Sequence, residues 1–406
     1  MKSNLKIKIK NKFFALKLKK ENKHLDVNDI NTNNQVVLIV DNLIPELDKD
    51  SGSRRLFKLI QLMLKNNFSV VLMADLKEYK YQSDYIERFR EKGVFVYEPY
   101  INENGKFISK ESFIKEIGDK IDFVWLHRPE IFHGYYNVIK NYCSHASVIF
   151  DMVDFHYLRL KREYDIDNNK DTLKAANEYL KIELDNCKNA DKIVLISTGD
   201  EEALKEYNID LTKAEILSNV HQHHTKNAEF ISFNDRKDLL FIGGFKHAPN
   251  EDAVLYLYNE IMPKIWAEYP ELIVNVIGSY ATPAVLDLNS DLFKIHGFVE
   301  DVSAYFETAK AFVAPLRYGA GIKGKIGQSL EYSLPVITTD VGAEGFDFSP
   351  YRDIMIANDA ETFANNVVKV ISDKTVFENL SNHAEHILAP FSIEQTEKNL
   401  LKILSK

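Results

Sequence analysis

A short glycine-rich stretch, GAGIKGKI at residues 319–326, combines two kinds of residue that bind phosphate. Glycines let backbone N–H groups approach an anion closely, and Lys323 and Lys325 carry charge that would neutralise a diphosphate. The stretch follows the apolar run AFVAPL (311–316) and precedes a helical pattern. Because a helix N-terminus also attracts anions, the residues predict a diphosphate-binding loop between a strand and a helix.

The glycine spacing matches two nucleotide motifs, but the context argues against both. Gly319, Gly321 and Gly324 spell the dinucleotide fingerprint, which belongs in the first strand–helix turn of a domain, with an acid about 20 positions later. Here the glycines follow a later strand, and the nearest acid, Asp340, comes too early. The stretch also resembles a P-loop, yet Ile326 stands where a magnesium-binding hydroxyl is needed. A turn with solvated lysines remains the alternative.

A second candidate group is D-x-x-D-x-H, formed by Asp151, Asp154 and His156 after the apolar run 147–150. Residues that follow a parallel strand lie at the ligand-binding edge of an α/β sheet. We therefore expect His156 to act in catalysis, with Asp154 either orienting it or capping the next helix. The H-x-H-H cluster at 221–224 has no carboxylate or cysteine at ligand spacing, so no metal site is expected.

The composition is that of an acidic globular protein. The chain has 406 residues and a net charge of −9, which argues against general binding of nucleic acids. Its two cysteines, Cys143 and Cys187, suit a reducing cytoplasm. No apolar run is long enough to cross a bilayer, and no signal peptide is evident. A cytoplasmic protein without nucleic-acid partners is expected.

Residues 1–24 depart from this acidic average. Lysines alternate with apolar residues, and Phe13, Phe14 and Leu16 follow. Such a segment can lie on an anionic membrane surface, which would hold the protein peripherally at the inner face of the membrane. A frayed or edge-strand extension is the alternative.

The rest of the chain alternates apolar runs with helix-length patterns. Runs without period-two alternation are typical of parallel strands covered on both faces, so the class is α/β with two doubly wound domains. Strands are expected in two series, at 36–40, 70–73, 94–97, 123–126, 147–150 and 192–196, then at 215–220, 238–244, 272–278, 293–298, 311–316, 335–339 and 353–357. Helices are expected at 54–67, 174–188, 250–268, 301–309, 324–333, 359–373, 375–388 and 393–404.

These series predict four parts of the chain. They are a basic extension and linker (1–34), a first Rossmann-like domain (35–212), a second (213–388) and a C-terminal helix that returns to the first domain (389–406). The polar stretch 221–237 is interpreted as the connection between the domains.

Six stretches resemble glycosyltransferase family 4 proteins of the GT-B fold, in the group 1 glycosyl transferases. They are LLFIGGFKHAPNEDAV (239–254), VIGS (276–279), HGFVEDVSAYF (296–306), APLRYGAGIKGKIGQSLEYSLPVITTDVGAEGF (314–346), VVLIVDNLIPELDKDSGSRR (36–55) and IFDMVDFHYLRLKRE (149–163). The resemblance implies two Rossmann-like domains that face a central cleft. It further implies a nucleotide-sugar donor in the second domain and an acceptor in the first, usually with retention and without a metal or other cofactor.

The resemblance also implies roles for single residues. Donor diphosphate contacts are expected from Gly243, Gly244, Lys246, Gly319, Gly321, Lys323, Gly324 and Lys325. Nucleobase contacts are expected from Phe298 and Val299. His156 would face the donor sugar, and Gly52 and Ser53 would lie near the sugar and acceptor.

The chain departs from the family at two glutamate positions. Ala320 and Gln328 stand where the family has glutamates, which leaves the sugar-facing carboxylate role vacant at Ala320. Gln328 can still bind ribose hydroxyls without charge assistance. Glu331, one turn later, is either a substitute at the ribose or a surface residue.

Two further candidates come from the residues themselves. Arg54 and Arg55 open the first predicted helix and form either a solvated face or a site for an anionic acceptor group. Glu344 follows a strand and either reaches the sugar or caps the next turn.

We therefore expect a hexosyl- or deoxyhexosyltransferase that uses a nucleotide-diphosphate sugar and a glycan or lipid-linked acceptor, in surface polysaccharide biosynthesis. A nucleotide-sugar epimerase of the same architecture is one alternative, which Ala320 and Gln328 disfavour. A non-catalytic sugar-nucleotide-binding protein is another, which the intact lysine–glycine loop disfavours.

Overall fold

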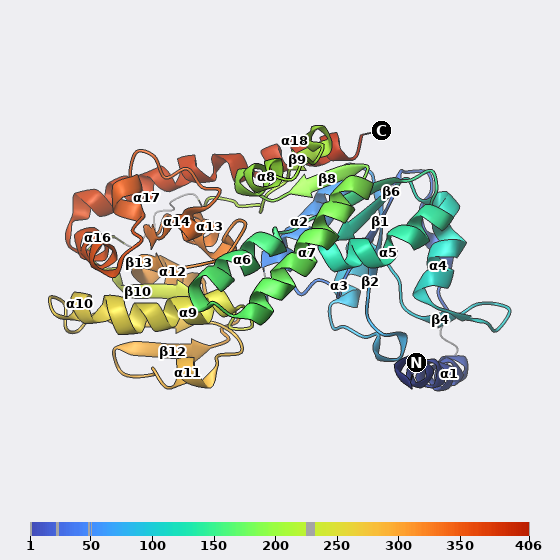
Figure 1. The fold of residues 1–406 in the computed structure, drawn as a ribbon, viewed down its shortest axis with the longest axis horizontal. Coiled ribbons are helices and arrows are strands. Elements are labelled where there is room, and N and C mark those ends of the chain that lie inside the picture. The colour runs from blue at the N-terminus through green and yellow to red at the C-terminus, as the bar shows by residue number, and fades with distance from the viewer. Residues whose placement is uncertain (1, 22–23, 48, 50, 225–231, 406) are drawn as a thin grey trace.

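The computed structural model describes residues 2–21, 24–47, 49, 51–224 and 232–405. Two parallel sheets form the centres of two domains that lie side by side (Figure 1). Within the described residues, no helix combines the length and apolarity needed to cross a membrane.

The first sheet has seven parallel strands in the order β3-β2-β1-β6-β7-β8-β9. All six residues of the central strand β1 are buried, because helices cover both faces of the sheet. The strands are β1 (Val36–Asp41), β2 (Ser69–Ala74), β3 (Phe95–Val96), β6 (Phe123–His127), β7 (Ser147–Asp151), β8 (Lys192–Leu195) and β9 (Ala214–Ile216). A small antiparallel hairpin joins β4 (Tyr100–Ile101) to β5 (Phe107–Ile108).

Amphipathic helices surround this sheet. In α2, for example, Leu56, Leu59, Ile60 and Met63 are buried at the helical spacing i, i+3, i+4 and i+7. The helices are α1 (Lys2–Glu21), α2 (Ser51–Lys65), α3 (Ile86–Arg90), α4 (Lys110–Ile117), α5 (Pro129–Tyr142), α6 (His156–Asp167), α7 (Lys170–Asn189), α8 (Thr198–Lys205) and α18 (Ile393–Ile403). Short 3-10 turns are η1 (Val27–Asp29), η2 (Glu78–Lys80), η3 (Gly118–Lys120) and η4 (Leu211–Lys213).

The second sheet has five parallel strands in the order β12-β11-β10-β13-β14. They are β10 (Lys237–Ile242), β11 (Val274–Ile277), β12 (Phe293–Gly297), β13 (Ala309–Ala314) and β14 (Val336–Thr338). The helices are α9 (Ala248–Tyr256), α10 (Met262–Trp266), α11 (Pro283–Leu286), α12 (Ser303–Thr308), α13 (Gly324–Glu331), α14 (Asp340–Ala343), α15 (Arg352–Met355), α16 (Ala360–Ser372) and α17 (Lys374–Leu388). A π-helical turn, η5 (Leu257–Ile261), joins α9 to α10, and the 3-10 turn η6 (Ala389–Phe391) follows α17.

In both sheets the strand order starts centrally, runs to one edge and then continues on the other side, as in Rossmann-like domains. The chain returns to the first domain at its end, where α18 packs against α2 and β9 (Figure 1). Leu400 and Ile403 of α18 are buried in the core of the first domain. The two crossings of the chain between domains touch, since the backbone N–H of His221 donates to the carbonyl of Phe391 at 2.9 Å.

Three expectations about the elements are wrong. The strand near 215 pairs with β8 and closes the first sheet, so it does not begin the second series. The apolar run 353–357 is mostly helical in α15, and Ile356 makes only an isolated bridge to Thr338. Residues 2–21 form a helix, so the edge-strand alternative for the N-terminal segment is also wrong. Part of the connection at 221–237 lies outside the described residues.

Candidate functional site

The predicted diphosphate loop lies between β13 and α13. Gly319 has a φ of +147° and Gly321 a φ of +66°, backbone conformations that favour glycine. Lys323 is the N-cap of α13, so the first free N–H groups of this helix follow the two glycines directly. The loop thus has the backbone donors and the helix N-terminus that an anion requires.

The two lysines of the loop have different surroundings. Lys323 Nζ donates to the carbonyl of Gly321 at 2.5 Å and lies 3.2 Å from Glu344 Oε2. Lys325 Nζ donates to the amide oxygen of Asn250 and lies over the ring of Phe241, 4.6 Å from its centroid. Burial, together with the nearby charge of Lys323, lowers the pKa of Lys325 to about 7. Among the described residues, no carboxylate forms an ion pair with Lys325.

The loop after β10 approaches Lys325 closely. A Cβ at Gly243 would lie 2.8 Å from Lys325 Nζ, and a Cβ at Gly278 would lie 2.0 Å from the carbonyl oxygen of Gly243. Gly244 accepts a hydrogen bond from Asn250 at 2.7 Å. The loops after β10 and β13 therefore meet at Lys325, and the loop after β11 packs on Gly243.

Lys246, the third expected cation, is exposed and lies over the ring of Tyr280, 3.7 Å from its centroid. Among the described residues, no contact joins Lys246 to the lysines of the loop after β13.

The first domain lies directly against this loop. A Cβ at Gly321 would lie 3.3 Å from the Cβ of Asp154, and a Cβ at Gly324 would lie 2.7 Å from the Cβ of Ser51. Since Asp154 follows β7 and Ser51 opens α2, the carboxyl ends of both sheets face each other here. Each glycine permits a close approach that a larger residue would prevent.

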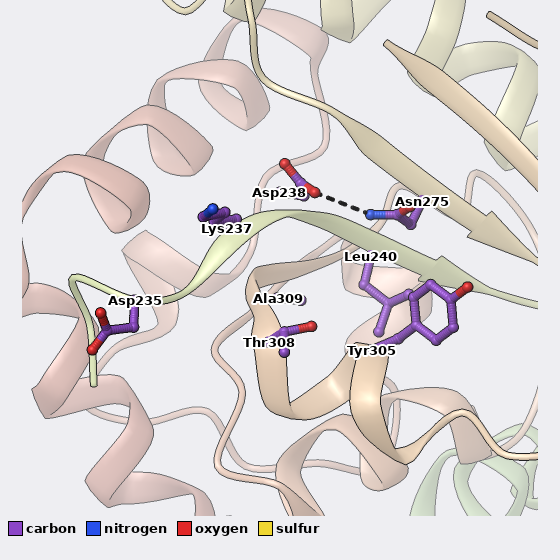
Figure 2. Close-up of a pocket in the computed structure, with 8 residues that line it drawn as sticks. All are labelled: Asp235, Lys237, Asp238, Leu240, Asn275, Tyr305, Thr308 and Ala309. Atoms are coloured by element: carbon purple, nitrogen blue, oxygen red, sulfur yellow. Dashed lines mark hydrogen bonds between the residues drawn. The ribbon is translucent and has the colours of Figure 1, made fainter. Parts of the chain in front are cut away.

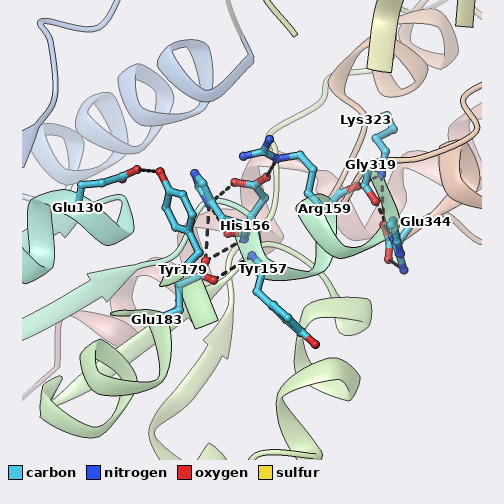
Figure 3. A network of polar contacts seen from close by, with 12 residues as sticks. Glu130, His156, Tyr157, Arg159, Tyr179, Glu183, Gly319, Lys323 and Glu344 are labelled. Carbon is cyan, nitrogen blue, oxygen red and sulfur yellow. Dashed lines mark hydrogen bonds and ion pairs between the residues drawn. The ribbon is translucent and has the colours of Figure 1, made fainter. Parts of the chain in front are cut away.

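Glu344 links the two domains (Figure 3). Both of its oxygens accept from the guanidinium of Arg162 on α6, each at 3.1 Å. Arg162 also donates to the carbonyl of Gly319 at 2.6 Å. The same carboxylate contacts Lys323, so Glu344 holds the loop against α6.

His156 opens α6 and is surrounded by carboxylates (Figure 3). Its Nδ1 lies 3.0 Å from Asp154 Oδ1 and 3.6 Å from Glu183 Oε1, and its ring stacks on Tyr179. Burial alone lowers the pKa of His156, but the carboxylate of Asp154 more than offsets this and the pKa rises to about 9. At neutral pH His156 is therefore an imidazolium, whose ring nitrogens both donate.

The partners of His156 are themselves fixed. Arg159 donates to Asp154 Oδ2 at 3.1 Å, and the pKa of Asp154 stays below its ordinary value because His156 and Arg159 outweigh the effect of burial. Glu183 accepts the backbone N–H groups of His156 and Tyr157 at 2.8 and 3.0 Å and so caps the start of α6. Burial raises the pKa of Glu183 to about 8.

The substitution Asp154→Asn is expected to lower the pKa of His156 from about 9 to 6.5 or below, because the effect of burial then prevails. The pKa can be followed by NMR of ring-labelled histidine, with His156→Gln assigning the signal. Arg159→Gln is the control of opposite sign, since it removes a nearby cation and raises the pKa. A midpoint that Asp154→Asn leaves near 9 would contradict this account.

The residues expected to bind the nucleobase and ribose differ in how far they are exposed. Phe298 is 54% exposed, Val299 packs against the core of the second domain, and Gln328 is half-buried on α13. Glu331 is already engaged, since His221 Nδ1 lies 2.9 Å from its Oε1. Glu331 is 8% exposed and is thus not a surface residue, while its place at the ribose stays a prediction.

At the start of α2 the two arginines differ. Gly52 is half-buried, Ser53 is fully buried and Arg54 is exposed. Arg55 is only 2% exposed, and its Nη1 lies 2.8 Å from Asp151 Oδ2. The solvated-face interpretation is therefore wrong for Arg55 and stands for Arg54.

Two residues at the domain boundary, Arg162 and Asp200, are not predicted as site residues from the sequence. Arg162 lies in the stretch HYLRLKRE, and nothing in the sequence indicates its partner Glu344. Asp200 follows Ser197 in an S-x-x-D capping pattern, and its Oδ2 accepts a hydrogen bond from the Ser197 hydroxyl at 2.8 Å. Burial, with the charges of Asp154 and Glu344, raises the pKa of Asp200 to about 7. Its position near Lys323 makes the loop's surroundings acidic.

A hollow of about 290 Å³ lies elsewhere in the second domain (Figure 2). It is lined by Asp235, Lys237, Asp238, Leu240, Asn275, Tyr305, Thr308 and Ala309. These residues include the first residues of β10 and β13, so the hollow is at the opposite end of the strands from the glycine loops. Among the described residues, no group of three His, Cys, Asp or Glu side chains is arranged to hold a metal ion.

The fold is similar to that of several solved structures. The sucrose-phosphate synthase of Thermosynechococcus elongatus matches with a TM-score of 0.68 at 14% identity, over 91% of this chain and 98% of that one. TarM of S. aureus, in complex with Fondaparinux, alpha-GlcNAc-glycerol and UDP, matches with a TM-score of 0.67 at 10% identity, over 91% and 100%. HepE of Anabaena, in complex with UDP-glucose, matches with a TM-score of 0.62 at 10% identity, over 91% and 99%.

A curated relative covers less of the chain. An uncharacterized 44.6 kDa protein in the cps region of Klebsiella pneumoniae is 22% identical over 177 residues. The match spans 41% of this chain and 44% of that relative, so it covers less than half of either protein.

Residues 236–373 match the family model of glycosyl transferases group 1. This range contains the second sheet, the glycine loop and Glu344. The second domain is thus similar to the glycosyl transferases group 1, and the chain as a whole has the GT-B fold.

Proposed function

We propose that the protein is a glycosyltransferase that moves a sugar from a nucleotide-diphosphate sugar to a glycan or lipid-linked acceptor. The observation that carries the proposal is Lys325, a half-buried lysine between glycine loops whose pKa is lowered to about 7, in the loop whose Gly321 faces Asp154 of the other domain. Burial of an uncompensated cation is unfavourable unless a bound anion offsets it. The family match and the UDP complexes of HepE and TarM support a nucleotide-sugar donor.

The proposed chemistry is a displacement in which the diphosphate leaves. The bond between the anomeric carbon and the phosphate oxygen breaks, and the acceptor hydroxyl oxygen bonds to that carbon. Lys325, Lys323 and the α13 N-terminus stabilise the negative charge that develops on the leaving diphosphate. In a retaining, metal-independent route, the departing phosphate oxygen takes the hydroxyl proton. His156, as an imidazolium, donates a hydrogen bond to the sugar and is not the base.

The proposed setting is surface polysaccharide biosynthesis in the cytoplasm, with peripheral contact at the inner face of the membrane. The relative in a cps region supports the polysaccharide role. A hexose or deoxyhexose is the proposed class of transferred sugar.

Thermal unfolding in the presence of UDP-, GDP-, dTDP- and CMP-sugars tests the proposal. One nucleotide sugar is expected to raise the melting temperature by several degrees, because a ligand at about 100 times its Kd stabilises by about 2.7 kcal/mol. Slow release of free sugar from the same donor is expected as well, whereas an epimerised donor would favour the epimerase. Stabilisation by none of these, but by NAD, would contradict the proposal.

A further inference from the structure

Within residues 10–21, whose side chains are described, the N-terminal helix α1 packs on the first domain through the face that contains Asn11, Phe14 and Leu18. Asn11 Nδ2 donates to Glu78 Oε2 at 3.3 Å, and the ring of Phe14 makes an edge contact with Phe107. Leu18 on the same face is 2% exposed. These contacts hold α1 beside η2 and the β4–β5 hairpin, at the outer end of the domain (Figure 1).

The opposite face of α1 is apolar and open to solvent. Phe13 is 69% and Leu16 is 52% exposed, and the helical period places both on the side away from Phe14 and Leu18. They lie one turn apart, so their side chains form a continuous apolar stripe. Because α1 already has a buried face, this second stripe is not needed for packing.

Exposed lysines surround that stripe. Lys12, Lys17 and Lys20 are all exposed. By the helical period Lys12 and Lys17 flank Phe13 and Leu16, and Lys20 follows one turn after Leu16 on the same side. We call these five residues the outer face. The whole helix, KSNLKIKIKNKFFALKLKKE, has eight lysines and one glutamate, whereas the complete chain has a net charge of −9. Positive charge is thus concentrated on this helix of an acidic protein.

We propose that the outer face of α1 binds the surface of an anionic lipid bilayer. Lysines beside apolar side chains match a surface with negative headgroups above an apolar interior. A nucleic acid would use the lysines but leave Phe13 and Leu16 in water. The acidic remainder of the protein is repelled by anionic lipid, so α1 also fixes which side of the molecule meets the bilayer.

This orientation bears on the acceptor. The 3-10 turn η2, which α1 contacts, follows β2 and so belongs to the carboxyl edge of the first sheet. A membrane-held acceptor would reach the first domain from the side of α1. The inference that the acceptor is lipid-linked rests on the proposed function, whereas bilayer binding by α1 does not.

Co-sedimentation of the full chain with vesicles tests the proposal. Strong binding is expected to vesicles of phosphatidylcholine and phosphatidylglycerol, and weak binding to phosphatidylcholine alone. F13S/L16S is expected to lower the partition coefficient by about 100-fold, because two large side chains lose their burial in lipid. K12Q/K17Q/K20Q is expected to lower it by about 100-fold and to reduce its salt dependence. The matched control I166S/L286S removes two exposed apolar side chains elsewhere and leaves binding unchanged.

The outcomes separate the lipid surface from the proposed function. Equal binding of F13S/L16S and the control, or equal binding to both kinds of vesicle, would overturn the proposal. A loss of dimers in F13S/L16S without a change in vesicle binding would assign the outer face to a second copy instead. The donor-induced melting shift is measured on the same variants. If the donor-induced melting shift is absent from the unsubstituted protein and from every variant, while the unsubstituted protein still binds vesicles, the transferase proposal fails and the lipid surface stands.

Discussion

Replacing Lys325 by methionine is expected to weaken binding of the nucleotide-sugar donor by about 100-fold. A hydrogen bond to a charged group contributes about 1.5–3 kcal/mol, and within the described part of the chain no carboxylate is paired with Lys325. Lys323→Met is expected to cost only about 10-fold, because Glu344 and Asp200 offset much of the charge of Lys323. The two lysines therefore differ in effect although both stand in the same motif.

Titration calorimetry with the stabilising nucleotide sugar measures both affinities. Lys310→Met is the matched control, since Lys310 is a half-buried lysine over the ring of Phe233 near the start of β13. It should leave donor affinity unchanged. Equal and small effects of all three substitutions would show that the loop does not bind the diphosphate.

The pKa of Lys325 adds a pH dependence to the same experiment. Its ordinary value of 10.5 is lowered to about 7 in the folded protein, and a bound diphosphate raises it again. Above pH 7 donor binding must therefore take up a proton, so affinity should fall by up to about tenfold per pH unit. Proton uptake, seen in buffers of different ionisation enthalpy, should vanish in Lys325→Met.

The same low pKa predicts a trade between stability and function. In the unliganded protein the buried charge of Lys325 lowers the free energy of unfolding, and this loss of stability is fully present below pH 7, where the lysine is protonated. The loss disappears as the pH rises from 7 towards 10.5. Lys325→Met should therefore leave the unliganded protein as stable as before, or more stable, while donor binding is lost. A loss of folding together with a loss of binding would not fit this account.

The sequence predicted the elements that long apolar runs and glycines determine. The central strands of both sheets are β-branched runs buried on two faces, and the glycine loop precedes a helix as expected. The predictions were wrong for short elements, whose apolar runs span only a few residues. The three residues of β9 are only half-buried at a sheet edge, and the apolar run 353–357 suits a short helix as well as a strand.

The site was predictable where a motif carries its own chemistry and not where pairing decides the role. His156 and the two loop lysines stand in local patterns, and the structure brings their loops together. Arg55 and Glu344 depend on partners 96 and 182 residues away in the chain. The spacing of residues within one motif does not show which distant residue becomes a partner. The buried Arg55 and the exposed Arg54 therefore could not be distinguished from the sequence.

Arg55→Met is expected to lower the free energy of unfolding of the first domain by about 3–5 kcal/mol. The substitution leaves the buried carboxylate of Asp151 without its cation, which costs more than the loss of an exposed pair. It also removes the hydrogen bonds from Arg55 to the carbonyl of Leu217, at 2.7 and 3.1 Å, in the segment that leads to the second domain. Arg54→Met, one residue earlier and exposed, should change stability by no more than about 0.5 kcal/mol.

Urea unfolding followed by the fluorescence of Trp125 measures this difference, because its Nε1 donates to Asp151 at 2.9 Å. A Trp266→Phe background removes the tryptophan of the second domain. Adding Asp151→Asn to Arg55→Met should restore part of the lost stability, since asparagine still accepts from Trp125 but carries no buried charge. If the double variant is less stable than Arg55→Met alone, the unpaired carboxylate is not the cause of the loss.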